Sequence, residues 1–277
     1  MIFPFPVSVN AVAATTDSSG GGGANFPWEM NGATWAGRGD DYTDTSLNNP
    51  GTGANVRRWN NRVSGSSLLI EQDDVSFAPP IVRLDPVISG VNMGSGASLD
   101  DFDIGSSFDN YISGNQWHAF AVVNFDDVTV AGGTLGHFIV GAISSEGSQP
   151  NLVTTAPWGI FLKEIGGQNY AVGYMYNGTD VFSVSGSVTE DEFTLIEFYS
   201  DGSTMGIRTN ASASSEVAIS GNVDNLSGRI PRIGSKFFNG TWEFATNRCF
   251  EISLASERNN DVTNVRSYFG TRYSIPT

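Results

Sequence analysis

The stretch CFEISLASERNNDVTNVRSYFGTRYSI, residues 249–275, decides the fold because its hydrophobic period changes halfway along. Its first part has the period of a β-strand: Phe250, Ile252 and Leu254 are apolar, and the residues between them are polar. Alternation of this kind places the three apolar side chains on one buried face of a sheet. Glu251 is then expected on the opposite face, pointing to solvent or across the sheet to a cation.

The second part of the stretch has the period of a helix. Val262, Val265 and Phe269 lie three and four residues apart, which puts them on one helical face. Gly270 follows them, and glycine is common at helix ends. The pattern predicts one short helix over residues 260–269.

The middle of the chain consists of short apolar segments separated by turn residues. Asn177-Gly178 and Asp201-Gly202 are dipeptides that favour the tight turns of β-hairpins. The predicted strands cover residues 117–125, 135–142, 158–165, 170–176, 181–185, 193–200 and 205–209. The first of them is apolar on both faces, as in a central strand that is covered on both sides. These features predict an all-β fold, a two-sheet antiparallel β-sandwich (jelly roll) with one short C-terminal helix and an extended N-terminal arm.

Two motifs near the ends of the predicted sandwich are similar to those of a known family. Residues 268–275 read Tyr-Phe-Gly-Thr-Arg-Tyr-Ser-Ile, and residues 56–65 read Val-Arg-Arg-Trp-Asn-Asn-Arg-Val-Ser-Gly, ahead of a Pro-containing strand at residues 78–82. Both motifs resemble concanavalin-A-like, laminin-G-like β-sandwich domains of the kind found in bacteriophage virion proteins. Asn61 stands where that family often has Asp. The resemblance implies one sandwich domain over residues 28–277.

An apolar arm and a glycine-rich linker precede this domain, over residues 1–27. The linker contains four consecutive glycines at residues 20–23, which form a flexible coil that cannot transmit rigid packing. The arm is therefore expected to lie outside the sandwich core and to contact a neighbouring chain. A secretory signal peptide is not expected, since no basic residue accompanies the apolar segment. The arm side chains expected to bind a partner are Ile2, Phe3, Phe5 and Val7.

Composition narrows the range of partners. The formal net charge of −15 repels nucleic acid and anionic membranes, and no segment approaches the roughly 20 apolar residues that span a bilayer. Neither nucleic acid binding nor membrane insertion is therefore expected. Cys249 is the one cysteine of the sequence, so an internal disulfide is impossible. We expect a half-buried, inert thiol at this position.

Several glycosidases share the concanavalin-A-like sandwich, so the resemblance directs attention to paired carboxylates. The laminarinase-like group carries its acid and nucleophile on one strand, as Glu-x-Asp-x-x-Glu or Glu-x-Asp-x-Glu. Ser253 stands where an Asp would follow Glu251, and Glu197 is followed only by a turn residue, Asp201. His118 lies in the most apolar strand and is expected in the core or at an interface. The sequence therefore predicts no catalytic residue and a chain that is not an enzyme.

Calcium is the one metal that the sequence suggests. Laminin-G-like domains sometimes hold a calcium ion at a loop rim, and calcium takes about six to eight oxygen ligands. Asp101 and Asp103, two residues apart in an acidic segment, are the candidate metal ligands. Acidic loops are common in a chain of this charge, so the expected cofactor is none, with calcium as the alternative.

The tryptophans raise the question of carbohydrate binding, because aromatic faces stack on sugar rings. Trp28 and Trp35 lie in the loop-rich region ahead of the predicted strands and are the candidates for glycan binding. The remaining tryptophans fall inside strand patterns or the family motif and are expected to be packed: Trp59, Trp117, Trp158 and Trp242.

Together these features predict a non-enzymatic virion structural protein of a bacteriophage, made in the host cytoplasm and located on the virion. The resemblance and the arm favour a capsid decoration or head-surface accessory protein that docks by its N-terminal arm. Its expected partners are other virion proteins, such as the major capsid or tail protein, and further copies of the chain in a homo-oligomer. Two alternatives stay open: a tail or fibre adhesin that binds a host-surface glycan, and a secreted bacterial lectin or glycoside hydrolase.

Overall fold

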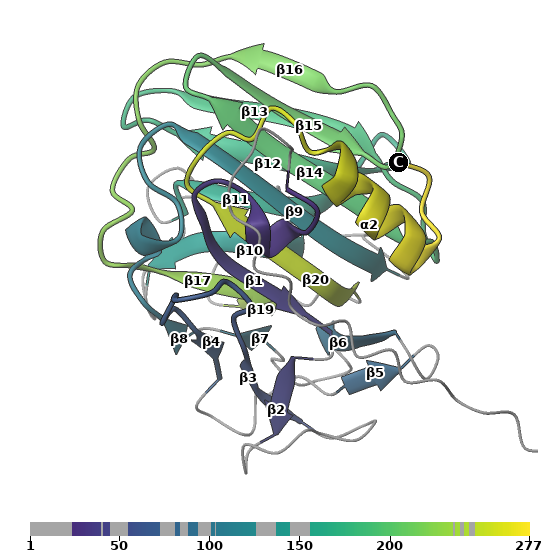
Figure 1. The fold of residues 1–277 in the computed structure, drawn as a ribbon. Helices are drawn as coiled ribbons and strands as arrows, with labels where there is room; N and C mark the ends of the chain where they lie inside the picture. Colours follow the sequence, from purple (N-terminus) through teal and green to yellow (C-terminus); the bar gives the residue numbers. More distant parts are fainter. Residues whose placement is uncertain are drawn as a thin grey trace, which may run out of the picture.

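Two antiparallel β-sheets face each other in the computed structural model of the chain, and helix α2 packs against the outer face of one of them (Figure 1). This arrangement confirms the predicted all-β sandwich with one short C-terminal helix. The predicted N-terminal arm lies outside the described residues. The structure describes residues 24–39, 41–44, 55–72, 81–83, 88–93, 101–102, 104–125, 137–144, 156–234, 236–238, 241–243 and 247–277.

The sheet that carries the helix, which we call sheet I, contains the strand predicted to be central. β9 (Gln116–Phe125) pairs with β14 (Thr194–Asp201) on one side and with β20 (Asn247–Ala255) on the other. The far edge of β20 is shared, since β6 (Ser89–Met93) pairs with its first part and β1 (Ala33–Arg38) with its last part. The remaining strands of sheet I are β15 (Thr204–Thr209), β16 (Ser215–Ala218) and β5 (Ile81–Arg83).

The facing sheet, sheet II, runs in the order β13-β12-β11-β10-β17-β7. Its β12–β13 hairpin turns at Asn177-Gly178, and the β14–β15 hairpin of sheet I turns at Asp201-Gly202. Both glycines have positive φ, so both hairpin predictions are confirmed. The strands of sheet II are β7 (Asp101–Phe102), β10 (His137–Ser144), β11 (Trp158–Ile165), β12 (Gln168–Tyr176), β13 (Val181–Ser187) and β17 (Arg229–Gly234).

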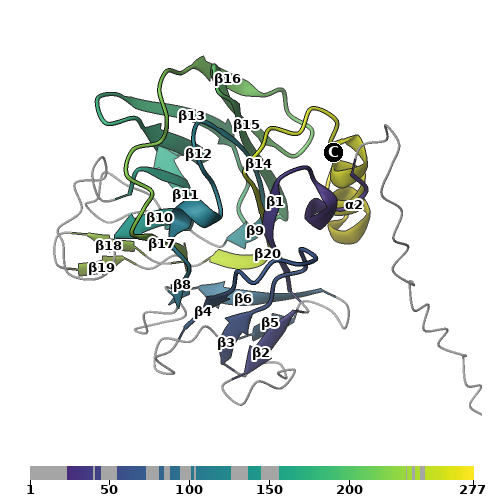
Figure 2. The same cartoon turned by 60° about the vertical axis from the view of Figure 1, so that its left-hand side comes forward.

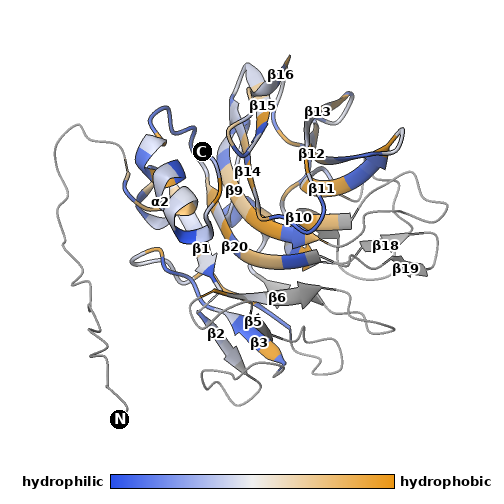
Figure 3. Ribbon diagram, turned by 90° about the vertical axis from the view of Figure 1, so that its right-hand side faces the viewer, coloured by the Kyte–Doolittle hydropathy of each residue, from blue (hydrophilic) through white to orange (hydrophobic). Residues whose placement is uncertain are grey.

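Apolar side chains of both sheets fill the space between them, and a second apolar cluster lies between sheet I and the helix. β9 contributes to both clusters because alternate residues of a strand face opposite sides. Trp117 and Ala119 lie in the inner core, whereas Phe120 packs under the helix. Every residue of β9 after Gln116 is buried, as expected for a strand covered on both faces. Figure 3 shows the resulting layers: helix α2, sheet I and sheet II.

A small sheet at one end of the sandwich contains the start of the family-like motif at residues 56–65 (Figure 2). In its strand β3 (Val56–Trp59) the indole of Trp59 is fully buried, and its Nε1–H donates to the carbonyl oxygen of Arg38 at 3.0 Å. Trp59 is therefore packed, as expected. The other short elements are β2 (Tyr42–Asp44), β4 (Ile70–Glu71), β8 (Ile104–Gly105), β18 (Lys236–Phe238), β19 (Thr241–Glu243), η1 (Pro27–Glu29) and η2 (Phe108–Asn110).

Helix α2 (Thr263–Tyr273) begins later and ends later than predicted. It continues through Gly270 and stops at Ser274, which adopts a left-handed conformation with φ of 55°. Gly270 serves close packing, because a Cβ there would lie 3.0 Å from the carbonyl oxygen of Ile275 in the chain tail. No helix in the part of the chain that the structure describes combines the length and apolarity needed to cross a lipid bilayer.

A β-bulge in β20 corrects the predicted orientation of Phe250. The register against β9 shifts between Cys249 and Glu251, so the strand accommodates one extra residue. Phe250 consequently packs beneath helix α2, whereas Ile252 and Leu254 stay in the inner core. Cys249 also lies in the inner core and is fully rather than half buried, and this burial raises the pKa of its thiol.

Candidate functional site

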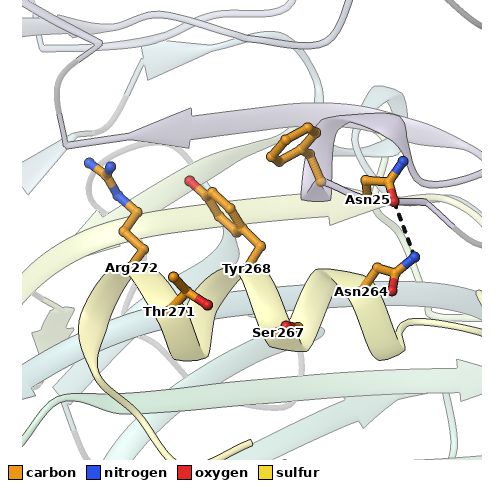
Figure 4. A pocket seen from close by; sticks show the side chains of 7 residues that line it. Asn25, Asn264, Ser267, Tyr268, Thr271 and Arg272 are labelled. Atoms are coloured by element: carbon orange, nitrogen blue, oxygen red, sulfur yellow. Dashed lines mark hydrogen bonds between the residues drawn. The ribbon is translucent and has the colours of Figure 1, made fainter. Parts of the chain in front are cut away.

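An open pocket of about 590 Å³ lies between helix α2 and the chain segment that precedes β1 (Figure 4). We call it the helix pocket. Its lining combines two aromatic rings with amide, hydroxyl and guanidinium groups, a set that offers both apolar contact and hydrogen bonding. The lining residues are Asn25, Phe26, Asn264, Ser267, Tyr268, Thr271 and Arg272.

The spacing along the helix explains why these groups share one side. Asn264, Tyr268 and Arg272 are four residues apart, so their side chains follow each other along one face of α2 (Figure 4). The opposite face carries buried apolar residues, including Val265 and Phe269, that bind the helix to sheet I. The helix is therefore fixed by its apolar face and presents its polar face to the pocket.

The aromatic side of the pocket is a cluster of three rings. Phe26 stacks on Trp28 with ring centroids 4.9 Å apart and an interplanar angle of 3°. Tyr268 contacts both rings edge-on, at 5.4 Å from Phe26 and 5.7 Å from Trp28. The guanidinium of Arg62 lies 5.0 Å from the centre of the Trp28 ring, a cation–π contact. These contacts hold the half-buried Phe26 ring in a defined orientation.

The polar side of the pocket offers exposed hydrogen-bonding groups. Asn264 donates from Nδ2 to Oδ1 of Asn25 at 3.1 Å, which ties the helix to the segment before β1 (Figure 4). Ser267 and Thr271 are also exposed on the helix. Their hydroxyls both donate and accept, so they suit a ligand that carries hydroxyl groups of its own.

A buried carboxylate supports this face of the helix from below. Glu251 is 1 % exposed and accepts hydrogen bonds from the hydroxyls of Tyr268 at 3.0 Å and Tyr273 at 2.8 Å. Burial raises the pKa of Glu251 to about 7, although these hydrogen bonds and the nearby charge of Arg272 act in the opposite direction. The expectation that Glu251 points to solvent is therefore wrong. Its hydrogen-bond donors come from the helix that covers it. Across the sheet, the cation Arg38 of β1 is its paired neighbour, and the charge of Arg38 also acts to lower its pKa.

A second buried carboxylate lies on the same outer face of sheet I. Glu197 is paired with Arg266 of the helix, with Nε to Oε2 at 2.8 Å and Nη2 to Oε1 at 2.9 Å, and with His118 at 2.9 Å. Burial acts to raise the pKa of Glu197, but the hydrogen bonds from His118 and Arg266 and the charge of Arg266 outweigh it and lower the pKa. β9 lies between the strands of Glu197 and Glu251. Each carboxylate therefore has its own set of partners.

The structure separates the two tryptophans that the sequence proposes for glycan binding. Trp28 is half-buried and stacks on Phe26, so it supports the wall of the helix pocket. Trp35 is fully buried in the inner core, where it packs edge-on against Trp59 at 5.4 Å, and it cannot present a face to a ligand. The expected packing of Trp117 and Trp158 is confirmed, since both are fully buried.

The remaining candidates fall partly outside the described residues. Asp101 begins β7, paired with Gly234, and Asp103 lies outside the described residues, so this candidate pair of metal ligands stays a prediction. Among the residues that the structure describes, no three His, Cys, Asp or Glu side chains gather to hold a metal ion. The arm residues Ile2, Phe3, Phe5 and Val7 also lie outside the described residues.

The chain is similar to several solved structures. Trypanosoma rangeli sialidase in complex with 2,3-difluorosialic acid (covalent intermediate) matches with a TM-score of 0.51 and 14% identity, over 89% of this chain and 34% of the sialidase. Another structure of Trypanosoma rangeli sialidase matches with a TM-score of 0.50 and 12% identity, over 89% and 34%. Domain 4 of a GH43 extracellular arabinanase from Geobacillus stearothermophilus, in complex with arabinotriose, has a TM-score of 0.43 and 14% identity, over 85% and 97%. No protein-family model matches the chain, and no curated protein matches it.

The two sialidase matches correct the expectation that the chain is not an enzyme. That expectation rested on the missing pair of carboxylates, but glycosidases do not all use such a pair, and sialidases use a tyrosine nucleophile. The chain spans about a third of the length of the sialidases that it matches. At this level of identity the likeness is one of fold alone, and it assigns the chain a β-sandwich fold of the kind that glycosidases contain.

Proposed function

We propose that the chain is a carbohydrate-binding β-sandwich domain and that a glycan occupies the helix pocket. The observation that carries the proposal is the lining of this pocket, where the Phe26 and Tyr268 rings meet Asn264, Ser267 and Thr271. A sugar ring has an apolar face that packs on an aromatic ring and hydroxyl groups at its rim that need donors and acceptors. The helix pocket supplies both kinds of contact side by side.

The dimensions of the pocket agree with this ligand class. Its volume of about 590 Å³ lies inside the range of roughly 300–1,000 Å³ that is typical of small-ligand sites. Because the pocket is open along helix α2, one sugar residue can occupy it while the rest of the glycan continues into solvent. The sialidases that share the fold offer further support, since one of them is solved with a sialic acid derivative bound.

The proposal is tested by screening the full chain on a glycan array and then measuring affinity for the best ligand by calorimetry. Phe26→Ala removes the stacking ring and is expected to weaken binding about tenfold, equivalent to ~1.4 kcal/mol. Asn264→Ala and Thr271→Ala are expected to weaken it less. Thr179→Ala, an exposed threonine in the β12–β13 turn, is the matched control and should bind normally. Unchanged affinity in Phe26→Ala would contradict the placement of the site.

Release of reducing sugar from the same glycans separates binding from turnover. Turnover that disappears together with binding in Phe26→Ala would make the helix pocket part of a glycoside hydrolase site. Binding without turnover would leave the chain as a glycan-recognition domain.

A second proposal concerns where the domain operates: on the surface of a bacteriophage virion, as a capsid decoration protein or as a tail or fibre adhesin for a host-surface glycan. It is supported by the apolar arm at residues 1–14, the tetraglycine linker and the net charge of −15, which together describe a soluble body tethered to an assembly. The major capsid or tail protein would be its partner. Mass spectrometry of gradient-purified virions tests this location, and a chain found only in the secreted fraction of a bacterial culture would favour a secreted lectin or hydrolase.

A further inference from the structure

A second groove lies on the other side of the molecule, on the outer face of sheet II, and the proposed glycan site does not involve it. The groove has a volume of about 250 Å³. Its floor contains Phe161, Val172 and Tyr174, which pack together as an apolar cluster on this face. We call it the sheet II groove.

Exposed apolar side chains mark the two ends of this groove. Ile165 of β11 is 49% exposed and Val181 of β13 is 52% exposed, and both line it. Among the side chains whose exposure the structure describes, these two are the large hydrophobic ones left exposed. Single exposed hydrophobics are ordinary, but two in one apolar groove indicate a partner that covers them.

The pairing registers give the length of the groove. Ile165 pairs with Gln168 at one end of β12, and Val181 pairs with Tyr176 at the other end. These two positions of β12 are eight residues apart, so the two exposed side chains lie about 26 Å apart along the strand direction. An extended peptide of six residues in the polyproline II conformation measures about 19 Å and fits within that length.

We propose that the sheet II groove binds residues 2–7 of a second copy of the chain, Ile-Phe-Pro-Phe-Pro-Val. Pro4 and Pro6 restrict this segment to extended conformations, and proline-rich segments of this kind dock into aromatic-lined grooves. Phe3 and Phe5 supply rings for the apolar floor. Residues 1–14 contain no charged side chain, so they can approach a body of net charge −15 without repulsion.

The position of the arm favours exchange between copies over binding within one copy. The described chain begins at Ala24, which packs in the cluster between sheet I and helix α2. The groove lies on the outer face of sheet II. Sheet I lies between helix α2 and sheet II (Figure 3). Residues 8–23, which join residues 2–7 to the described chain, have a root-mean-square span of about 22 Å as a flexible coil. Straight through the molecule, the helix layer and the two sheets measure at least ~25 Å, and the path around the flank is longer. The path to the groove of the same copy is therefore longer than the average span of residues 8–23, which favours a groove on another copy.

The oligomeric state of the full chain, measured by sedimentation velocity, tests the proposal. The unaltered chain is expected to self-associate, and the arm variant Phe3→Asp/Phe5→Asp to be monomeric. Val181→Glu is expected to be monomeric as well, because it places a charge in the groove. Ser215→Glu adds the same charge to an exposed position of β16 and is the matched control that should still associate. Monomeric behaviour of the unaltered chain, or association that survives Val181→Glu, would overturn the proposal.

A direct binding experiment identifies the occupant of the groove. A labelled peptide of residues 1–10 is titrated into the full-length Phe3→Asp/Phe5→Asp variant, whose own arm no longer competes. Addition of Val181→Glu to that variant should weaken peptide binding at least about tenfold, whereas addition of Ser215→Glu should not.

Photo-cross-linking then distinguishes an arm bound in the groove of another copy from an arm bound in the groove of its own copy. A photoreactive phenylalanine analogue at position 5 is expected to cross-link to β11–β13, and mixed samples of isotopically light and heavy chain should give mixed cross-links. Cross-links to β11–β13 that are confined to one isotope would overturn exchange between copies, and cross-links elsewhere would overturn the groove itself.

Discussion

The Nε2 atom of His118 lies 2.9 Å from Oε1 of Glu197, and neither side chain is more than 2 % exposed. The other ring nitrogen of His118 receives hydrogen bonds from Arg258, at 2.9 Å, and from the backbone N–H of Asn259, at 3.3 Å. Nδ1 is therefore the acceptor, and Nε2 carries the proton that is donated to Glu197. Burial lowers the pKa of His118, although Glu197 acts to raise it, and this favours the neutral ring. The pair joins β9 and β14 to the loop ahead of helix α2.

Glu197→Ala is expected to destabilise the fold by ~3–5 kcal/mol. The substitution leaves Arg266 without the carboxylate that it contacts at 2.8 Å and removes the hydrogen-bond partner of His118. Urea denaturation of the variant and of the unaltered chain measures the difference. Glu192→Ala, at an exposed position, is the control and should lie within about 0.5 kcal/mol of the unaltered chain.

Glu251→Gln is expected to change how stability depends on pH. The pKa of Glu251 is about 7 in the folded chain against an ordinary value of 4.5, so its protonated form is favoured by folding. The stability linked to this group is complete below pH 4.5 and is lost as pH rises through about 7. Glutamine keeps an acceptor for Tyr268 and Tyr273 without the charge. The difference in free energy of unfolding between the variant and the unaltered chain should therefore favour the variant more at pH 8.5 than at pH 5. Denaturation at both values measures the gain, and an equal difference at both would contradict the assignment.

Acid should weaken the fold through the His118–Glu197 pair, in the opposite direction to Glu251. The folded-state pKa of His118 is lowered from 6.5, so its contribution is complete above pH 6.5 and declines as pH falls below that value. The pKa of Glu197 is lowered from 4.5, so its contribution is lost as pH falls below 4.5. In His118→Gln the loss of folding stability between pH 6.5 and pH 5 should be smaller than in the unaltered chain. Thermal unfolding measured across that pH range tests this.

Tyr268 combines two roles that substitution can separate. Tyr268→Phe keeps the ring in the helix pocket but removes the hydrogen bond to Glu251, so it should cost about 0.5–1.5 kcal/mol of stability and leave glycan affinity within about twofold. Tyr268→Ala also removes the ring and should reduce affinity about tenfold. Calorimetry with the ligand from the array measures both variants. An equal loss of glycan affinity in Tyr268→Phe and Tyr268→Ala would mean that the ligand contacts the hydroxyl of Tyr268 rather than its ring.

Gly173→Ala should be destabilising although it adds only a methyl group. A Cβ at this position of β12 would lie 2.5 Å from the Phe198 ring of the facing sheet. Overpacking of this kind costs about 1–3 kcal/mol. The double variant Gly173→Ala/Phe198→Leu should recover part of that loss, and denaturation of the single and double variants measures the coupling.

The sequence indicates the local elements well because the local pattern determines them. The apolar run of β9, the turns at Asn177-Gly178 and Asp201-Gly202, and the existence of helix α2 all follow from neighbouring residues. The bulge at Phe250 does not, because an alternating pattern reads as one continuous face until the partner strand shows the extra residue. Helix α2 passes Gly270 because contacts with the tail stabilise the last turn, which no helix-stop rule includes.

The helix pocket could be predicted only in part. The polar spacing of Asn264, Tyr268 and Arg272 is visible in the sequence as one face of a helix. The contact of this helix face with Phe26 is not visible in the sequence. That contact depends on the pairing of β1 with β20, in which Ala33 faces Ala255. The same pairing buries Trp35, which in the sequence looks like any aromatic residue in a loop-rich region.

The junction of β1 with β20 also determines when the chain can fold. Thr34 and Leu254, joined by a hydrogen bond between them, are 220 residues apart in the sequence. On the ribosome, β9 and β14 are synthesised long before β20 emerges, and β9 then exposes an unpaired apolar edge. Sheet I is therefore completed only after translation reaches β20, through contacts of very high sequence separation that form slowly. Until β20 has been synthesised, that edge of β9 is open to pairing with another chain.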